Sequence, residues 1–496
     1  MSRYLLGYDV GSSSVKAALV DADTGRLLAT SSSPDVELPI AAPKPGWAEQ
    51  DPESWWREAV NATGRLRERF PFAGKDVAAI GIAYQMHGLV CLDKDGKVLR
   101  PSIIWCDSRA VETGAAMARE LGGEYCARHL LNEPGNFTAA KLAWMRQHEP
   151  ELHARVKTYL LPGEWLAFRM TGQAVTTASG LSEGMAWDFS GDRVAEEVLA
   201  LAGVDANATG KILPVFAPQG ELNAEAAAAL GLEKGTPICY RAGDQPNNAF
   251  SLGVLEPGEV AATCGTSGVV YAVGDKPCGD PGMRWNVFAH VTHTAAAPRY
   301  GALLCLNGAG ITYSWWRRIL AAGGAAPAYD KLNALAEAAP AGAGGLTMLP
   351  FGNGAERMLG NQCPGASLHA IDFNRHGPGE VLRAAIEGVA FALADGLLAM
   401  RDKGIPINML RAGRANLFLS PVFRATLASA AGVRVELYET DGAGGAARGA
   451  GLGAELFPDA RSAMAGLESL GGEDADPSIQ SEVAAAFARW QAANVG

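Results

Sequence analysis

The first thirty residues alternate short apolar runs with turns of small polar residues. Residues 4–8 and 15–20 are mainly apolar, 26–30 are extended in pattern, and the turns at 11–14 and 21–25 are rich in Gly, Ser and Asp. Runs of this length between such turns are typical of β-strands joined as hairpins. The pattern therefore predicts an antiparallel meander at the start of the chain.

A second hairpin of the same kind is predicted near the middle of the chain. Residues 259–264 and 269–273 are apolar, and the turn between them reads Gly265-Thr266-Ser267-Gly268. This turn comes about half a chain length after the one at Gly11. A repeat at half length indicates two similarly built lobes. Short Gly and Ser turns are common, however, so the repeat needs support from other features.

Helical and strand patterns alternate along the rest of the chain. The helical segments are 52–70, 109–121, 383–401 and 420–431, strands are expected at 77–83 and 88–92, a glycine cluster at 442–453 enters a helix, and 471–477 reads as a surface loop. Such alternation predicts an α/β fold. The best boundary lies within residues 246–257, which gives an N-terminal domain of 1–245 and a C-terminal domain of 246–496.

Composition and charge exclude several classes of protein. With 496 residues, 48% of them hydrophobic and 19% charged, the chain is neither disordered nor fibrous. A net charge of −11 argues against a broad surface for nucleic acid or anionic lipid. The sequence contains no apolar run long enough for a membrane span, and Asp9 interrupts the apolar start too early for an export signal. The eight cysteines form no CxxC pair, which argues against a zinc or disulfide framework. We therefore expect a cytoplasmic globular protein.

The first turn has the composition of a phosphate site. Glycine at Gly11 lets a backbone approach a ligand closely, Ser12 and Ser13 offer donors, and Lys16 adds a positive charge. Asp9 could hold hydrated Mg²⁺. The spacing is not that of a Walker loop, and an ordinary Ser-rich hairpin tip remains the alternative.

Several ordered segments carry a family resemblance. They are Gly7 to Lys16, Gly46 to Trp56, Gln85-Met86-His87-Gly88, Pro101 to Arg109, Ala242-Gly243-Asp244-Gln245, Gly265 to Val269, Arg383 to Gly388, and Ser420 to Arg424. In their order and spacing they resemble the FGGY family of carbohydrate kinases over nearly the whole chain, most closely its xylulokinase branch. The resemblance implies the two-lobed α/β fold of actin, hexokinase and Hsp70, built from duplicated ribonuclease H-like domains, with ATP between the lobes.

The resemblance also implies roles for residues around the sugar. Asp244 takes the role of catalytic base, with Gln245 beside it, and a carboxylate is the acceptor that an attacking hydroxyl needs. Gln85, Met86 and His87 fall where xylulokinases contact the sugar, and Trp105 is a possible wall of the same pocket. Read alone, Asp244 would equally suit a helix N-cap and His87 a buried core position.

The segment expected to bind the nucleotide resembles the family less closely than the sugar-binding segments do. By resemblance, the ATP-binding residues are Gly11, Ser12, Ser13, Lys16, Gly265, Thr266, Gly310, Gly413, Arg414 and Asn416. Ala412 replaces a glycine of the family's adenosine-binding segment, and about three extra residues separate Gly413 from Ser420. The nucleotide preference therefore stays open.

Together these features predict an ATP- and Mg²⁺-dependent kinase that converts D-xylulose to D-xylulose 5-phosphate. The alternatives are another ketopentose or polyol, such as ribulose, fuculose or glycerol, or a non-catalytic ATP-binding protein of the same fold. Glycerol kinases carry charged residues where this chain has Met86 and His87, which weighs against glycerol. The expected partners are the sugar and ATP, with no nucleic acid or membrane, and the chain is a possible homodimer.

Overall fold

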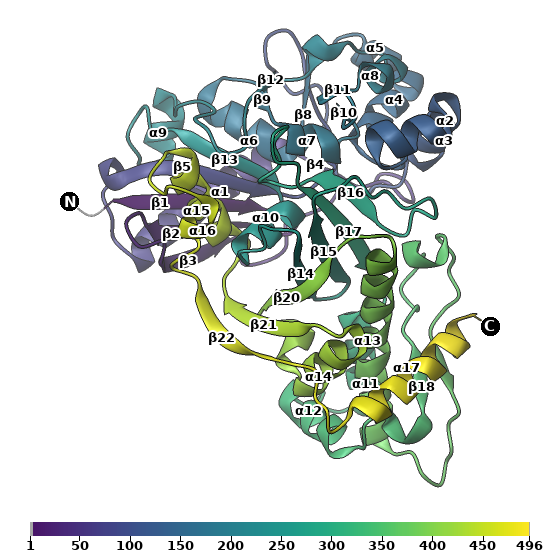
Figure 1. Ribbon diagram of the computed structural model, residues 1–496. Coiled ribbons are helices and arrows are strands. Elements are labelled where there is room, and N and C mark those ends of the chain that lie inside the picture. The colour runs from purple at the N-terminus through teal and green to yellow at the C-terminus, as the bar shows by residue number, and fades with distance from the viewer. Residues whose placement is uncertain (1–2, 496) are drawn as a thin grey trace. The chain divides into compact units, whose positions relative to one another are not determined.

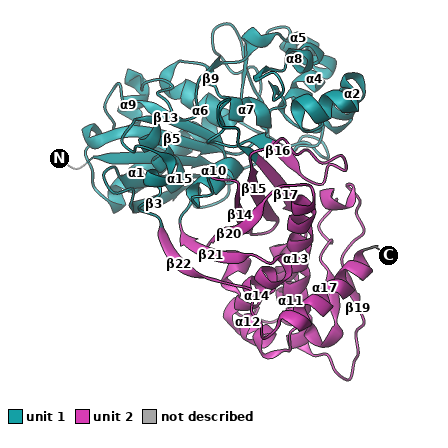
Figure 2. Ribbon diagram, viewed as in Figure 1, with its two compact units in different colours: residues 1–255, 288–300, 440–467 teal, residues 256–287, 301–439, 468–496 magenta. Residues whose placement is uncertain are grey.

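A computed structural model describes residues 3–495 and divides into two compact units (Figure 2). Unit 1 contains residues up to 255 together with 288–300 and 440–467, and unit 2 contains 256–287, 301–439 and 468 onward. The first break falls within the predicted boundary segment. Two stretches from the second half of the chain nevertheless belong to unit 1, so the units differ from the simple halves 1–245 and 246–496.

Unit 1 is built on a five-stranded sheet in the order β13-β5-β1-β2-β3. The predicted meander is present as β1 (Tyr4–Val10), β2 (Val15–Asp21) and β3 (Leu27–Ser33), which pair antiparallel. β5 (Val77–Tyr84) and β13 (Ile238–Gly243) extend the sheet parallel to β1. The carboxyl ends of β1, β5 and β13 therefore meet at one edge of the sheet.

The remaining elements of unit 1 lie outside this sheet. They are β4 (Glu49–Gln50), α1 (Pro52–Arg69), β6 (Val90–Leu92), β7 (Ser102–Ile103), α2 (Val111–Leu121), α3 (Gly123–Tyr125), α4 (Thr138–His148), α5 (Pro150–His153), β8 (Thr158–Leu160), α6 (Pro162–Thr171), β9 (Val175–Thr176), α7 (Ala178–Glu183), β10 (Trp187–Asp188), β11 (Arg193–Val194), α8 (Glu196–Ala202), β12 (Lys211–Ile212), α9 (Ala224–Leu230), α10 (Asp244–Ser251), α15 (Gly442–Gly453) and α16 (Ala460–Ala463). Helix α1 begins at an N-cap, Asp51, whose side chain accepts from the Glu53 amide, and it buries Trp55, Ala59 and Leu66 on one face.

Helix α15 packs unusually closely on the sheet of unit 1 (Figure 1). The sequence predicted a glycine cluster that leads into a helix, whereas the cluster is the helix itself. A Cβ atom added to Gly7 on β1 would lie 1.9 Å from the Ala443 carbonyl oxygen, and one added to Gly81 on β5 would lie 1.9 Å from that of Ala446. Glycine on the strands and small residues on the helix are thus required for this contact.

Substituting Gly7 with alanine is therefore expected to destabilise the protein. The new methyl group meets a helix carbonyl that cannot rotate away, so the free energy of unfolding should fall by at least about 1–3 kcal/mol. Gly64 on α1 is the control, because a Cβ there meets nothing within 4 Å. Gly64→Ala should instead stabilise by about 0.5–1 kcal/mol, since alanine is the better helix former. Urea unfolding of both variants tests this, and equal stabilities would contradict the packing described.

Unit 2 repeats the pattern of a hairpin extended by parallel strands. Its seven-stranded sheet has the order β16-β17-β15-β14-β20-β21-β22. The predicted second hairpin is present as β14 (Gly258–Cys264) and β15 (Gly268–Gly274), and β20 (Ile407–Gly413) pairs parallel to β14. The other elements are β16 (Asn286–Ala289), β17 (Tyr300–Leu306), α11 (Gly310–Leu320), α12 (Tyr329–Ala338), β18 (Thr347–Leu349), β19 (Ser367–His369), α13 (Pro378–Asp402), α14 (Pro421–Ala431), β21 (Arg434–Glu439), β22 (Glu468–Glu473) and α17 (Gln480–Val495).

One local prediction for unit 2 needs correction. Residues 471–477 were predicted as a surface loop, but their first residues belong to β22, which pairs antiparallel with β21. This edge strand is mostly exposed and contains Gly471 and Gly472, so it lacks the alternation of apolar and polar residues that marks a half-buried strand. Backbone pairing with β21 is what forms it.

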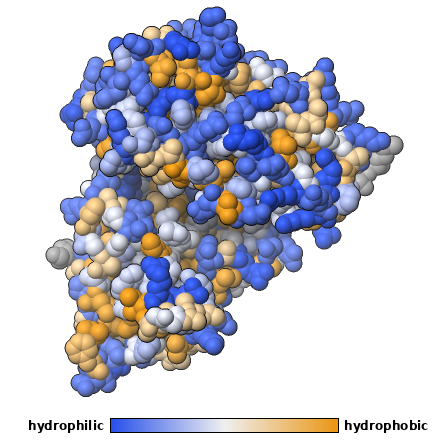
Figure 3. Space-filling view, turned by 180° about the vertical axis from the view of Figure 1, so that it is seen from behind, coloured by the Kyte–Doolittle hydropathy of each residue, from blue (hydrophilic) through white to orange (hydrophobic). Residues whose placement is uncertain are grey.

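On the face shown in Figure 3, apolar residues lie mainly as separate groups among polar ones. Within residues 3–495 we find no helix that combines the length and the hydropathy needed to cross a membrane.

Candidate functional site

The sheet edge of unit 1 gathers the residues predicted for catalysis and sugar binding. Asp9 lies at the end of β1, His87 lies in the turn after β5, and Asp244 follows β13 directly. These strands are parallel neighbours, so their carboxyl ends place the three residues at the same edge. Such an edge is a common place for ligands in α/β proteins.

Asp244 is the first residue of α10 rather than its cap. Gly243 occupies the N-cap position, so the alternative of a simple capping aspartate is not what the structure shows. Burial, and after it the nearby Asp9 carboxylate, raise the pKa of the Asp244 carboxyl to about 7, and hydrogen bonds from Gln245 oppose this rise. A carboxylate that titrates near neutral pH is suited to act as a general base.

This pKa leads to a pH prediction. A base must be unprotonated to accept a proton, so kcat/KM for the phosphoryl acceptor should rise from about pH 5.5 to about pH 8.5 with an apparent pKa near 7. Initial rates across this range, at saturating ATP, measure the profile. A flat profile down to about pH 5.5 would contradict the raised pKa.

Asp9 sits in a crowded, partly buried position. Burial raises the pKa of its carboxyl, Lys16 opposes this rise, and Asp441 adds to it. A Cβ atom on Gly442, the first residue of α15, would lie only 2.5 Å from Asp9 Oδ2, so this glycine also makes room for the carboxylate. The pKa of this half-buried carboxyl is raised in part by a second acid. A bound cation would therefore stabilise its ionised form.

The His87 turn forms the other side of the site. His87 adopts a left-handed conformation with φ of 62°, and its side chain is 20% exposed, so it is not a closed core histidine. Its Nδ1 lies 3.0 Å from the main-chain oxygen of Glu183, and the ring contacts Phe137 and Phe288 at centroid distances of 4.5 and 5.5 Å. Met86 is buried against Gly243, the residue before Asp244.

Gln85 is buried, whereas Trp105 is exposed. Gln85 is 3% exposed and donates from Nε2 to Gln50 Oε1 at 3.3 Å, and Gln50 in turn donates to the Ser12 carbonyl at 2.6 Å. Trp105 is 53% exposed and its Nε1 lies 3.3 Å from Ser12 Oγ. Gln50 thus ties the Gln85 strand end to the first hairpin tip, a link that the sequence did not indicate. A direct sugar contact of Gln85 stays a prediction.

The first hairpin tip is ordered by its own backbone. The Gly11 amide donates to the Ser14 carbonyl at 3.0 Å, which closes the turn. Ser13 and Lys16 are exposed, and Gly11 and Ser12 are partly exposed. The tip can therefore offer hydroxyl and ammonium donors to an anion, as predicted for a phosphate.

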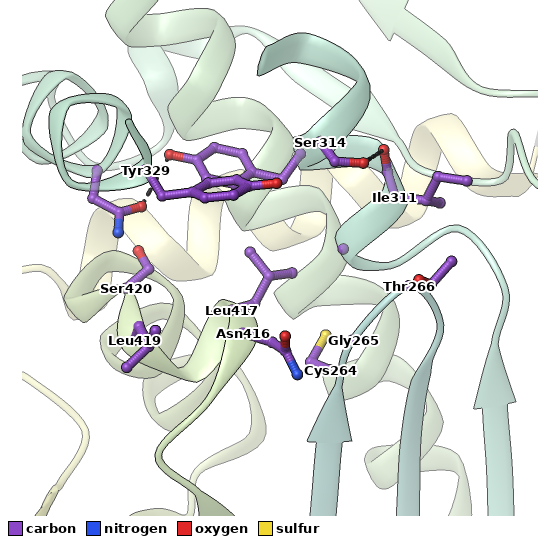
Figure 4. A pocket seen from close by; sticks show the side chains of 13 residues that line it. Cys264, Gly265, Thr266, Ile311, Ser314, Tyr329, Asn416, Leu417, Leu419 and Ser420 are labelled. Carbon is purple, nitrogen blue, oxygen red and sulfur yellow. Dashed lines mark hydrogen bonds between the residues drawn. The ribbon is translucent and has the colours of Figure 1, made fainter. Parts of the chain in front are cut away.

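Unit 2 contains a cavity of about 320 Å³ next to the second hairpin (Figure 4). It is lined by Cys264, Gly265, Thr266, Gly310, Ile311, Tyr313, Ser314, Tyr329, Asn333, Asn416, Leu417, Leu419 and Ser420. The start of α11 is tied to the hairpin tip, because the Gly310 and Ile311 amides donate to the Gly265 and Thr266 carbonyls. A cavity of this size with apolar walls and a few amides suits a nucleoside.

Four of the predicted ATP-binding residues line this cavity, namely Gly265, Thr266, Gly310 and Asn416. Gly413 and Arg414 are not among its lining residues, and Arg414 instead pairs with Glu439 at 3.3 Å. The extra residues before Ser420 form a 3₁₀ turn that supplies Leu417 and Leu419 to the wall.

Sequence reasoning missed the aromatic part of this cavity. Tyr313 and Tyr329 stack with ring centroids 5.9 Å apart, and the Tyr313 hydroxyl donates to Asn333 Oδ1 at 2.9 Å. The two helices that carry them are separated by a Gly- and Ala-rich stretch, which gives no periodic signal.

Comparison with known proteins agrees with this geometry. Residues 4–251 match the N-terminal domain and residues 260–454 the C-terminal domain of the FGGY family of carbohydrate kinases. The chain is 31% identical to a xylulose kinase of Klebsiella pneumoniae, over 90% of this chain and 88% of that protein. It is 27% identical to a gluconokinase of Bacillus licheniformis, over 81% and 78%.

A solved structure supports the fold. The xylulose kinase from Rhodospirillum rubrum matches with a TM-score of 0.88 and 25% identity, over 99% of this chain and 98% of that one. The predicted α/β fold of the actin, hexokinase and Hsp70 type is thereby confirmed. The chain belongs to the FGGY family of carbohydrate kinases, enzymes that transfer a phosphoryl group to a sugar hydroxyl.

Proposed function

We propose that the protein uses ATP and Mg²⁺ to phosphorylate D-xylulose, giving D-xylulose 5-phosphate. The observation that carries this proposal is the sheet edge of unit 1, where Asp244, with a pKa raised to about 7, shares an edge with Met86 and His87. Relatives that are named xylulose kinases support this choice of sugar.

In this proposal Asp244 accepts the proton of the sugar hydroxyl as that oxygen attacks the γ-phosphorus. The bond from phosphorus to the ADP oxygen breaks, and ADP leaves. Because the transition state of phosphoryl transfer is loose, orientation of the hydroxyl by Asp244 contributes as well as its basicity. In unit 1 the Ser12 hairpin tip offers donors to a phosphate, and in unit 2 the cavity lined by Tyr313 and Asn333, next to the Thr266 tip, holds the nucleoside.

Asp9 is the residue that fits Mg²⁺. Mg²⁺ in proteins usually keeps several of its waters and binds through one or two carboxylates. Asp9 supplies one such carboxylate, which is partly buried and whose pKa is raised by burial and by Asp441. The ion would supply neutralisation of charge on the ATP phosphates.

A neutral sugar fits the unit 1 site better than a sugar acid such as gluconate. The buried cations beside the His87 turn are already engaged, since Lys141 donates to the His87 carbonyl and Arg109 forms ion pairs with Asp107 and Glu49. The ionised Asp244 carboxylate, which the proton transfer requires, would repel the carboxylate of a sugar acid. Initial rates of ADP release with D-xylulose, L-xylulose, D- and L-ribulose, L-fuculose, glycerol and gluconate test the choice. A higher kcat/KM for any other compound would replace D-xylulose in the proposal.

His87→Ala should raise the KM for the sugar by about 10-fold or more, the scale of one lost hydrogen bond and an apolar contact. The KM for ATP should stay within about twofold, because the nucleoside cavity lies in unit 2. Steady-state kinetics with each substrate varied in turn measure both values. His369→Ala, which removes an exposed histidine of unit 2, is the control and should leave both unchanged. Equal losses for sugar and ATP would indicate damaged folding instead.

A further inference from the structure

The left-handed turn at His87 must be held by its surroundings. Positive φ values are uncommon outside glycine and persist where neighbouring groups over-determine them. Contacts of this kind come from α4 and α7. The His87 carbonyl accepts from Lys141 Nζ at 2.7 Å, its amide donates to Glu183 Oε2 at 3.3 Å, and its Nδ1 lies 3.0 Å from the Glu183 carbonyl oxygen. Since a carbonyl only accepts, the ring carries its hydrogen on Nδ1.

Lys141 is an unusual residue to find in this place. It lies on α4 among Leu142, Ala143 and Met145, and it is 0% exposed. The pKa of its ammonium is lowered to about 7, mainly by burial and to a lesser extent by Arg109. Asp107, Cys106 and Glu183 oppose this lowering. A buried ammonium is costly, so this position needs a reason that packing alone does not supply.

Glu183 links the turn to the catalytic residue. Its carboxylate oxygens would lie 3.0 and 3.1 Å from a Cβ atom on Gly243, the residue that precedes Asp244. Glu183 is 1% exposed and ends α7, so it is as firmly enclosed as Lys141. The turn is thus held from α4 through its carbonyl and from α7 through its amide and ring.

We propose that Lys141 is a positioning residue for the acceptor sugar, which acts by fixing the His87 turn against Glu183 so that the imidazole faces Phe137 and Phe288 in one orientation. This inference rests on the proposed function of the unit 1 site. Lys141 itself does not contact the sugar; its effect on sugar binding passes through His87.

The first test is Lys141→Met, which keeps the length of the side chain and removes its donor. The KM for the sugar should rise about 10- to 100-fold, the size of a hydrogen bond to a charged group, with the KM for ATP within about twofold. The melting temperature should stay within a few degrees, because removal of a buried charge offsets the lost bond. Lys94→Met, at a lysine whose side chain is 83% exposed, is the matched control. An unchanged sugar KM would overturn the proposal.

A double-mutant cycle separates positioning from general damage. If Lys141 acts through His87, the sugar KM of Lys141→Met with His87→Ala should match that of His87→Ala alone. If the two increases in sugar KM multiply in the double variant, Lys141 acts independently of His87 and the proposal is overturned. If Lys141→Met does not fold, Lys141→Leu, which also lacks the donor, replaces it in the same cycle with the same two outcomes.

The proposal can also be judged without any turnover. With ¹³C-labelled histidine, the His87 ring signal, identified by its loss in His87→Ala, should shift in Lys141→Met and stay in place in Lys94→Met. An unmoved signal would overturn the positioning role. If the unsubstituted protein phosphorylates none of the sugars tested, the proposed function fails, while this signal still decides whether Lys141 fixes His87.

Discussion

Asp244→Asn is expected to lower turnover by about 10²- to 10⁴-fold while sugar and ATP still bind. Asparagine keeps the size of the side chain and much of its hydrogen bonding but cannot take the proton of the attacking hydroxyl. Part of the loss will reflect poorer orientation of that hydroxyl, because little proton transfer occurs early in a loose transition state. Of all the substitutions considered, this one should separate binding from chemistry most cleanly.

Steady-state turnover and calorimetric sugar affinity measure the two sides of this prediction. Asp402→Asn, at an exposed aspartate that ends α13, is the control and should keep the parent turnover. A variant of Asp244 that retains turnover within threefold of the parent would rule out its role as the base. Loss of sugar affinity together with turnover would point to a structural role instead.

Asp9→Asn is expected to reduce turnover by at least about 100-fold at low Mg²⁺, because charge neutralisation at the phosphates is worth several kcal/mol. The pKa of Asp9 is raised by burial and by Asp441, so removal of its charge should not unfold the protein. Higher Mg²⁺ should restore part of the activity, and sugar affinity should be unchanged.

Turnover measured against Mg²⁺ concentration tests this directly. Asp23→Asn, in the exposed turn between β2 and β3, is the control within the same unit. Excess chelator should abolish the activity of the parent protein. Full activity in chelator, or an identical Mg²⁺ dependence for parent and Asp9→Asn, would contradict the assignment of the metal to Asp9.

Local sequence pattern was enough to predict both hairpins and the main helices. Strands β1, β2, β14 and β15 are short apolar runs set between turns of glycine and hydroxyl residues, and helix α1 has clear apolar periodicity. These signals are local, and tertiary contacts reinforce them. The edge strand β22 had no such signal, because its residues are exposed and it forms through pairing with β21.

The place of α15 could not be predicted from local pattern. Its contact with Gly7 and Gly81 joins residues more than 350 positions apart, and it depends on the absence of side chains. A glycine cluster reads as a turn or a loop when its partners are unknown. The close contact of α15 with the sheet is what brings residues 440–467 into compact unit 1.

Only part of the candidate site could be predicted from the sequence. Asp9 was singled out from the composition of the first turn, and His87 and Asp244 because the family motifs contain them; the sheet topology explains why the three come together. Lys141 and Glu183 were missed, since a lysine inside an apolar helix and a glutamate at a helix end have no meaning until the His87 turn is seen. Phe288 comes from a strand 201 residues further along the chain, beyond any local signal.

The most direct test of the account is a ³¹P spectrum of the protein incubated with ATP, Mg²⁺ and D-xylulose. We expect one sugar phosphomonoester to appear for each ADP formed, with both absent when the sugar is left out and both formed at least about 100-fold more slowly when Asp244→Asn replaces the parent. ATP that stays intact, or that gives only inorganic phosphate and ADP, would contradict the account.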